Sequence, residues 1–245
     1  MTRLTVSILT PTFNRRKYIP MLIECYKNQT YPNELMEWIV VDDGEDSVED
    51  LFKGVKGVRY YRYEEKLKLG KKRNILNSLA KNEIIVYMDD DDYYPPDRVK
   101  HAVTKLASKP QVKIAGSSLM YLYFCHLGKI CTVGPYGHFH ATAGTFAFRR
   151  ELLKECKFDD DAECSEESKF LKNYSIPMVQ LDPMKTILVI SHDTNTFDKK
   201  QLIGKETQFR MKMTNLTLKS FCKKKEFKRV KDFYRSIEKI EDKKE

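Results

Sequence analysis

The chain has 245 residues, of which 41% are hydrophobic and 32% charged, enough for one substantial core. Residues 199–245 hold 16 Lys and Arg against 7 Asp and Glu, so this segment alone accounts for the net charge of +9. The rest of the chain is neutral, which excludes a body shaped to bind a polyanion, and we expect no nucleic-acid partner. Six cysteines lack the paired spacing of a zinc site, so we expect reduced thiols.

The first residues form an apolar stretch that is soon interrupted. Residues 1–10 are followed at once by Pro11, Asn14 and two arginines, so the stretch is too short for a secretory signal or a membrane span. We therefore expect a soluble, cytoplasmic protein.

The first hundred residues alternate apolar runs with helical spacing. The predicted strands are 4–9, 38–41, 58–63 and 84–88, and the predicted helices are 16–30 and 71–79. Strands that alternate with helices are typical of a doubly wound parallel sheet, whose ligands bind beyond the carboxyl ends of the strands. We therefore expect Asp42, Asp43 and the acids 89–92 to face one crevice.

The second half is less regular. Its patterns predict helices at 96–108, from 150 and at 159–172, a strand pair at 113–124 and 129–133, and strands at 145–149 and 184–190. Residues 206–245 place six apolar side chains among lysines and predict one or two basic helices. Such a tail fits either a solvated helical face or peripheral attachment to an anionic membrane or partner.

Four consecutive carboxylates, Asp89 to Asp92, follow directly on the apolar run 84–88. Adjacent like charges repel, and burial at the end of a strand adds a desolvation cost. A bound divalent cation is the simplest compensation. Mg²⁺ or Mn²⁺ fits, because these ions prefer oxygen ligands and complete their shell with water and substrate phosphates. A solvated acidic turn is the alternative.

Four ordered motifs resemble those of the family 2 glycosyltransferases of the GT-A fold. They are residues 7–15 (SILTPTFNR), 39–44 (IVVDDG), 72–74 (KRN) and 87–92 (YMDDDD), the last followed by a proline three residues later. Four motifs in order are far more specific than a lone D-x-D. The resemblance implies a doubly wound, mostly parallel sheet flanked by helices.

The resemblance also implies a division of the chain. A GT-A domain would span residues 1–200, with a nucleotide-sugar-binding half at 1–98 and an acceptor-binding half at 99–200. Residues 201–245 would form a basic helical C-terminal extension.

The nucleotide site implied by the resemblance begins after the first strand. Pro11, Phe13 and Arg15 would contact base, ribose and phosphate there, although core packing is the alternative for Phe13. The acid pair after the second strand would accept a hydrogen bond from the base, with Asp43 as first choice and Asp42 as second.

The remaining donor residues follow from the third and fourth motifs. Arg73 would place its guanidinium against the base or the diphosphate, unless it is a solvated helix charge. The family's D-x-D maps onto Asp89 on the ribose side and Asp91 on the metal, with both as metal ligands and Asp90 also near the nucleotide, since four acids leave the register open. His192 follows the last apolar run, where the resemblance implies a histidine that reaches the metal or the diphosphate. It is the third predicted metal ligand, and a purely structural histidine is the alternative.

Direct displacement at the anomeric carbon needs a carboxylate that takes the proton of the acceptor hydroxyl. Residues 162–171 resemble the family's Glu-Asp segment, with Glu167 in place of the usual Asp, so Glu167 or Glu166 is the predicted base. The alternative is that both are ordinary acids favoured by a helix N-terminus.

The leading hypothesis is therefore an inverting glycosyltransferase that depends on Mn²⁺ or Mg²⁺. It would move a sugar from a UDP- or GDP-sugar to a hydroxyl of a glycan, glycoprotein or glycolipid. A sugar nucleotidyltransferase is disfavoured, because it would carry a glycine-rich phosphate loop where this chain has residues 11–15. A non-catalytic sugar-nucleotide-binding module, docking on membrane or nucleic acid through its lysine-rich tail, is the other alternative.

Overall fold

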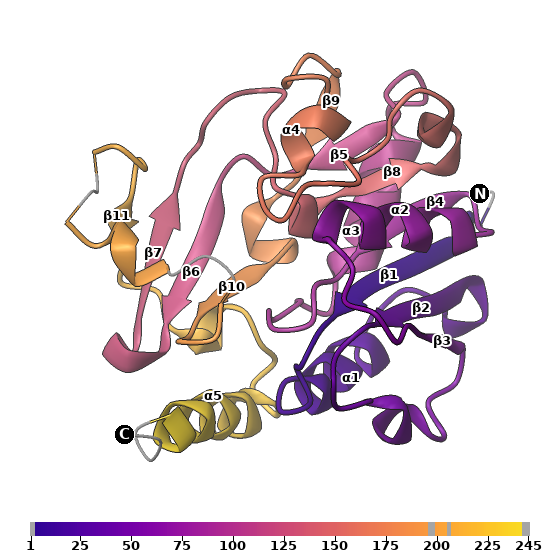
Figure 1. Cartoon of the computed structure of the whole chain (residues 1–245). Helices are drawn as coiled ribbons and strands as arrows, with labels where there is room; N and C mark the ends of the chain where they lie inside the picture. Colours follow the sequence, from indigo (N-terminus) through magenta and orange to yellow (C-terminus); the bar gives the residue numbers. More distant parts are fainter. Residues whose placement is uncertain (1–2, 196–198, 205–206, 242–245) are drawn as a thin grey trace.

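The computed structural model describes residues 3–195, 199–204 and 207–241, the side chains of 238–241 excepted (Figure 1). In chain order the strands are β1 (Val6–Thr12), β2 (Met36–Asp42), β3 (Val58–Arg62), β4 (Ile84–Tyr87), β5 (Ile114–Gly116), β6 (Met120–Phe124), β7 (Lys129–Val133), β8 (Ala147–Arg149), β9 (Met178–Gln180), β10 (Leu188–Ser191) and β11 (Lys212–Met213). The α-helices are α1 (Ile19–Lys27), α2 (Leu69–Leu79), α3 (Arg98–Ala107), α4 (Glu167–Phe170) and α5 (Phe227–Glu241).

The strands form two sheets that lie side by side in Figure 1. The larger has the order β3-β2-β1-β4-β8-β5-β9, and the smaller the order β10-β6-β7-β11. In the larger sheet β3, β2, β1 and β4 are parallel, β8 is antiparallel to both neighbours, and β5 and β9 are parallel to each other. The predicted doubly wound, mostly parallel sheet is confirmed.

The register of the parallel strands brings their carboxyl ends to one edge. Thr12 at the end of β1 pairs with Asp42 at the end of β2. Leu9 pairs with Tyr87, so the acids after β4 lie beside the last residues of β1. The loops that follow these strands therefore gather at the same edge, as expected for a doubly wound sheet.

Alternating side chains of the larger sheet build two cores. Ile8, Val40 and Val86 face one side, where α1 and α3 pack, while Leu9, Val41 and Tyr87 face the other, where α2 and α4 pack. Side chains at i and i+2 of a strand share a face, so one sequence supplies both cores. Each fully buried apolar side chain contributes about 1.5–3 kcal/mol. The parallel strands are thereby held from both faces.

Several elements of the second half differ from the sequence-based prediction. Strands β9 and β11 were not predicted, and the helix predicted from 150 is a 3₁₀ helix at Arg150–Lys154. The predicted strand 113–124 is divided into β5 and β6, which belong to different sheets, and Ser117 between them donates its N–H to Thr145 Oγ1 at 3.0 Å. The predicted helix 159–172 is reduced to α4. Its acidic start is instead tied to α2, because Asn74 Nδ2 donates to Phe158 O at 3.0 Å and Asp160 Oδ1 at 2.7 Å.

The C-terminal segment joins the smaller sheet. β11 pairs with β7, and α5 buries Val230, Tyr234 and Ile237 against the core while Arg229 contacts Glu24 of α1 at 2.6 Å. The predicted basic helix is present as α5, at the bottom of Figure 1. A domain boundary at residue 200 stays a prediction.

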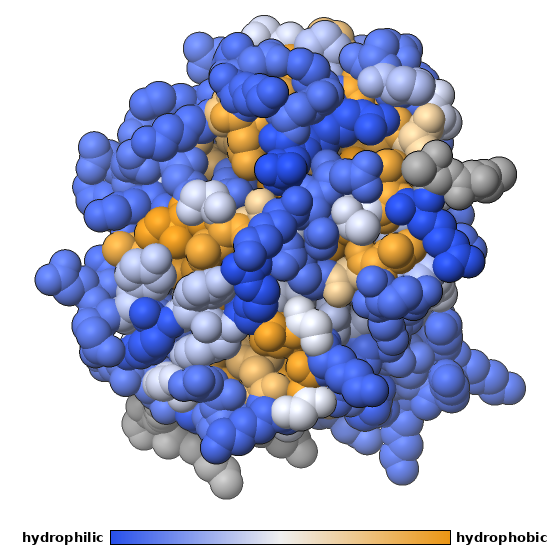
Figure 2. Space-filling view, turned by 90° about the vertical axis from the view of Figure 1, so that its right-hand side faces the viewer, coloured by the Kyte–Doolittle hydropathy of each residue, from blue (hydrophilic) through white to orange (hydrophobic). Residues whose placement is uncertain are grey.

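The face drawn in Figure 2 is predominantly hydrophilic. On the face drawn in Figure 2, charged and polar side chains separate the apolar areas from one another. Among the described residues, no helix combines the length and the apolar character that crossing a membrane requires.

Candidate active site

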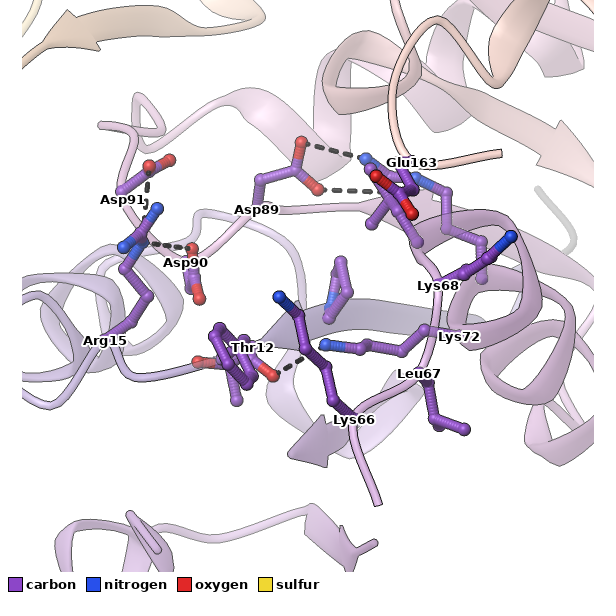
Figure 3. A pocket seen from close by; sticks show the side chains of 14 residues that line it. Thr12, Arg15, Lys66, Leu67, Lys68, Lys72, Asp89, Asp90, Asp91 and Glu163 are labelled. Atoms are coloured by element: carbon purple, nitrogen blue, oxygen red, sulfur yellow. Dashed lines mark hydrogen bonds and ion pairs between the residues drawn. The ribbon is translucent and has the colours of Figure 1, made fainter. Parts of the chain in front are cut away.

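A cleft of about 510 Å³ opens at the carboxyl ends of β1 and β4 (Figure 3). Most of its lining is charged or polar. The lining residues are Pro11, Thr12, Phe13, Arg15, Lys66, Leu67, Lys68, Leu69, Lys72, Arg73, Asp89, Asp90, Asp91 and Glu163. Seven of the residues predicted to bind the nucleotide or a metal line this cleft together: Pro11, Phe13, Arg15, Arg73, Asp89, Asp90 and Asp91. Such a mixture of cations and carboxylates suits an anionic ligand that also carries hydrogen-bond donors.

Arg15 lies against the acid tract on one side of the cleft (Figure 3). Its Nε is 3.8 Å from Asp90 Oδ1 and 3.7 Å from Asp91 Oδ2, and its Nη2 donates to the carbonyl of Thr194 at 2.6 Å. Burial and the neighbouring Asp91 raise the pKa of Asp90 to about 7, although Arg15 opposes this. The arginine thus offsets part of the repulsion that four adjacent acids create.

Asp91 and His192 form a close pair, with Asp91 Oδ2 3.1 Å from His192 Nε2. On the other side of the ring, Nδ1 is 3.1 Å from Thr194 Oγ1, and the Tyr18 ring packs on the imidazole at 4.5 Å. Burial lowers the pKa of His192, which favours the neutral imidazole. Burial opposes ionisation of Asp91, yet the hydrogen bond with His192 and the nearby Lys199 bring its pKa below its ordinary value. An ionised carboxylate therefore lies beside a neutral imidazole.

The fit of this region to a divalent ion can be judged from the side-chain atoms that could bind a metal. Among the described side chains, no group of three His, Cys, Asp or Glu residues is arranged to hold an ion. Asp91 and His192 provide two possible metal ligands. Both carboxylate oxygens of Asp89, in contrast, already accept hydrogen bonds from Arg73. Two protein ligands fit Mg²⁺ or Mn²⁺ that takes its other ligands from water and substrate phosphates. Metal binding, including by Asp89, stays a prediction.

Arg73 connects the donor side of the cleft to the segment before α4. It donates from Nη1 and Nη2 to Asp89 at 3.0 and 3.2 Å, and from Nε to Glu166 Oε1 at 2.6 Å. Its guanidinium lies 4.7 Å from the centre of the Tyr87 ring. Arg73 is 3% exposed, so it is a buried clamp and not a solvated helix charge. Paired in this way, its donors hold two carboxylates at a fixed separation.

A glycine permits the approach of the segment that carries Glu166. The N–H of Gly70 donates to Ala162 O at 3.0 Å, and a Cβ at Gly70 would lie 1.7 Å from Asp159 O. Only glycine allows α2 and residues 159–162 to come this close. The start of α2 therefore brings the segment 163–167 to the cleft, where Glu163 is part of the lining.

The two candidate bases have different surroundings. Glu166 is buried and bound by Arg73, whereas Glu167 is only half-buried. Burial, followed by repulsion from Glu166, raises the pKa of Glu167 to about 7. A carboxylate with such a pKa can accept a proton near neutral pH. The surroundings therefore favour Glu167 over Glu166 as a proton acceptor.

Asp42 and Asp43 lie at the predicted edge but do not line the cleft. Asp42 accepts hydrogen bonds from the N–H groups of Gly44 at 2.9 Å and Val48 at 3.2 Å, and from the Tyr60 hydroxyl. Asp43 accepts the N–H of Leu67 at 2.6 Å and forms an ion pair with Lys72. Both therefore organise the loops around the cleft in this structure, and contact with a base stays a prediction.

Sequence reasoning missed the lysines that line the cleft. Lys66 Nζ lies 4.6 Å, and Lys72 Nζ 5.7 Å, from the centre of the Phe13 ring. Burial lowers the pKa of Lys72, while its ion pair with Asp43 opposes the shift. The signal was present as Lys66 and Lys68 alternating with leucines just before α2, which places both lysines on one side of an extended segment.

Comparison with known proteins finds similarity to glycosyltransferases. The model of the Glycosyl transferase family 2 matches residues 7–122. The poly(ribitol-phosphate) beta-N-acetylglucosaminyltransferase TarS of Staphylococcus aureus is 30% identical over 106 residues, which is 39% of this chain and 18% of TarS. An uncharacterized glycosyltransferase of Haemophilus influenzae is 27% identical over 110 residues, 44% of this chain and 36% of that protein. The chain thus spans well under half of these relatives.

Solved structures share the fold. S. aureus TarS 1–349 in complex with UDP-GlcNAc superposes with a TM-score of 0.63 at 19% identity, covering 78% of this chain and 60% of that one. The mannosyltransferase PcManGT from Pyrobaculum calidifontis, in complex with GDP-Man and Mn²⁺, gives 0.64 at 18% identity, covering 80% and 59%. The matched segment 7–122 holds every cleft residue except Glu163. The similarity to glycosyl transferase family 2 therefore covers residues 7–122, just under half of the chain.

Proposed function

We propose that this protein is a glycosyltransferase that moves a sugar from a nucleotide-diphosphate donor to a hydroxyl acceptor. The observation that carries the proposal is the cleft at the carboxyl ends of β1 and β4, with cations around it and the Asp91–His192 pair at its edge. Ligands of doubly wound sheets bind at this edge. Donors seen with the structural neighbours, UDP-GlcNAc and GDP-Man, support a UDP- or GDP-sugar.

Different residues of the cleft would contact different parts of the nucleotide-sugar donor. The Phe13 ring, with Lys66 beside it, offers a flat surface for the base, while Arg15 and Lys72 offset the charge of the diphosphate. Asp91 and His192 would hold Mn²⁺ or Mg²⁺. When bound, the ion would act as a Lewis acid that stabilises the charge developing on the departing diphosphate.

The acceptor side provides the proton acceptor. The acceptor oxygen attacks the anomeric carbon from the face opposite the diphosphate, forming the new C–O bond as the bond to the diphosphate breaks. Glu167 takes the hydroxyl proton, and a single displacement inverts the anomeric configuration. Burial, followed by the charge of Glu166 that Arg73 holds nearby, raises the pKa of Glu167, although Arg73 itself opposes the shift.

Donor hydrolysis tests the proposal without a known acceptor. We would incubate the protein with UDP- and GDP-sugars, with Mn²⁺, with Mg²⁺ and with EDTA, and follow release of the nucleoside diphosphate. We expect cation-dependent release from at least one donor and loss of release in Asp91→Asn. Raised melting temperatures without release from any donor would instead indicate a non-catalytic binding module.

We further propose that α5 contacts an anionic membrane surface, peripherally and from the cytoplasmic side. Its inner face, Val230, Tyr234 and Ile237, is already buried, so the helix cannot insert. Its outer side and the preceding turn expose basic residues: Lys223, Lys224, Lys225, Lys228, Arg229 and Arg235. Attraction to acidic lipids would therefore be electrostatic.

Vesicle sedimentation tests this contact. We expect binding to phosphatidylglycerol vesicles at low salt and no binding to phosphatidylcholine. At 0.5 M salt we expect release, because the Debye length falls to about one third of its low-salt value or less and the charges are screened. Equal binding to both lipids would rule out the proposal.

A further inference from the structure

Three aromatic side chains stack on one another outside the donor cleft. The ring centre of His140 lies 4.5 Å from that of Tyr174 in a stacked arrangement and 4.8 Å from that of Tyr136. All three are half-buried, and the adjacent Phe139 is 42% exposed. We call Tyr136, His140 and Tyr174 the aromatic stack. Tyr136 packs against one hydrophobic core and Tyr174 against the other, but none of the three rings is fully buried and none lines the cleft.

The backbone that presents Tyr174 is unusual. Lys172, Asn173 and Tyr174 have φ values of 49, 55 and 59°, three consecutive left-handed residues without a glycine. In this region Cβ crowds the carbonyl oxygen, so L-residues rarely adopt it in succession. Hydrogen bonds from Asn173 N to Ser168 O at 2.7 Å and from Ser175 N to Leu171 O at 3.0 Å hold the turn. Strained backbone of this kind is concentrated at functional sites.

The stack lies near the proposed reaction centre. Tyr174 follows α4, which begins at Glu167, and the negative charges of Glu167 and Glu166 add to burial in raising the pKa of the Tyr174 hydroxyl. His140 lies in the loop 134–144. At the end of that loop, a Cβ added to Gly144 would be 2.8 Å from Asp89 Oδ2. One loop thus runs from the aromatic stack to Asp89 in the donor cleft.

The loop is held in place at the stack. Gln180 at the end of β9 donates from Nε2 to the carbonyls of His138 at 2.8 Å and His140 at 3.1 Å. Among the described residues, His140 Nδ1 is buried and has no hydrogen-bond partner. A buried polar atom without a partner costs free energy, which marks the stack as a costly arrangement.

We propose that the aromatic stack is an acceptor subsite that binds a sugar ring, with the C–H face of the sugar on Tyr174 and a hydroxyl near His140. The inference rests on the proposed function, since the acceptor hydroxyl must reach Glu167. A pyranose suits the site because it combines an apolar face, which packs on aromatic rings, with hydroxyls at its rim. The acceptor class is therefore a carbohydrate, not a peptide or a lipid alone.

Saturation-transfer NMR on the full chain tests the subsite. The acceptor probes are methyl β-D-glucopyranoside, methyl β-D-galactopyranoside and methyl N-acetyl-β-D-glucosaminide, and the donor-site probes are UDP and GDP. We expect at least one glycoside to bind the wild type and Tyr174→Phe, which keeps the ring. Tyr174→Ala should bind it about tenfold more weakly, a loss of about 1.4 kcal/mol. Nucleotide binding should be the same in all three.

Controls separate the subsite from general damage. Tyr61→Ala, on β3, removes a half-buried tyrosine outside the cleft and should change neither glycoside nor nucleotide binding. Melting curves show whether each variant is folded, and His140→Ala tests the same stack should Tyr174→Ala unfold.

The outcomes distinguish this inference from the proposed function. Nucleotide binding without glycoside binding, or glycoside binding unaffected by Tyr174→Ala and His140→Ala, overturns the subsite and leaves the donor site intact. Glycoside binding that depends on Tyr174, without binding of UDP or GDP, overturns the donor assignment and supports a sugar site.

Discussion

The acids after β2 and the acids after β4 follow the same local pattern but have different surroundings. Asp42 and Asp43 have side chains that are 1% and 0% exposed, and backbone N–H groups, Tyr60 and Lys72 occupy their oxygens. The side chains of Asp89, Asp90 and Asp91 are 23%, 10% and 15% exposed and line the cleft. One pair stabilises loops, and the other acids remain able to meet a ligand.

The comparison teaches that an acid at the end of a buried strand has two possible uses. When N–H groups and cations of the protein satisfy its oxygens, its contribution is to stability. When partners are fewer and the side chain faces a cleft, its charge is available to a ligand. The acid tract shows both within four residues. Asp92, buried and accepting the N–H of Ile190 at 2.8 Å, positions β10, while Asp91 next to it faces the cleft.

Asp91→Asn gives the largest expected effect. The substitution keeps the shape and removes the charge beside His192, so we expect donor turnover to fall by about 10³-fold, the loss of about 4 kcal/mol of transition-state stabilisation. Steady-state release of nucleoside diphosphate measures it. The melting temperature should change little. Full turnover in this variant would place Asp91 with the loop-stabilising acids.

Glu167→Gln is expected to reduce turnover by about 10²-fold, because the acceptor hydroxyl loses its base. The wild type should also show a pH dependence. Since the pKa of Glu167 is raised to about 7, the base is ionised above that pH and protonated below it, so turnover should fall as pH falls through about 7. A pH–rate profile checks this. The Glu166→Gln variant keeps the base but lacks the neighbouring charge, so the midpoint of its pH–rate profile should move to lower pH.

Asp43→Asn should reduce stability more than donor binding. It leaves Lys72, 4% exposed, without its counter-charge, and breaking a buried ion pair costs about 3–5 kcal/mol. Urea unfolding measures the loss in the free energy of unfolding. If stability were unchanged while UDP or GDP affinity disappeared, Asp43 would have the nucleotide-contacting role predicted from the sequence.

Gly144→Ala is expected to have the smallest effect. The new methyl group would lie 2.8 Å from Asp89 Oδ2, so the carboxylate must move within its bidentate contact with Arg73. We expect about fivefold weaker donor binding, close to 1 kcal/mol. Titration calorimetry with UDP or GDP tests this. An unchanged affinity would mean that Asp89 can move without consequence, which would separate it from Asp91.

Much of the site was predictable because its residues follow strands. The motifs placed Pro11, Phe13 and Arg15 at or just after the end of β1 and the acid tract after β4, and the structure gathers them in one cleft. The sequence could not show that Arg73 bridges Asp89 and Glu166, since this contact spans 93 residues of chain on one side and 16 on the other. The reduction of the predicted helix 159–172 to α4 has the same origin, because Asn74 ties the acidic segment to α2.

The sequence by itself determined the order of strands and helices in the first hundred residues and the edge at which ligands gather. These follow from local apolar periodicity and from the rule that parallel strands end at one edge. Only the tertiary structure decided which carboxylate oxygens are hydrogen-bonded within the protein, which lysines line the cleft and which glutamate has a raised pKa. Burial and charge pairing depend on atoms that are close in space and distant along the chain, so no local pattern contains them.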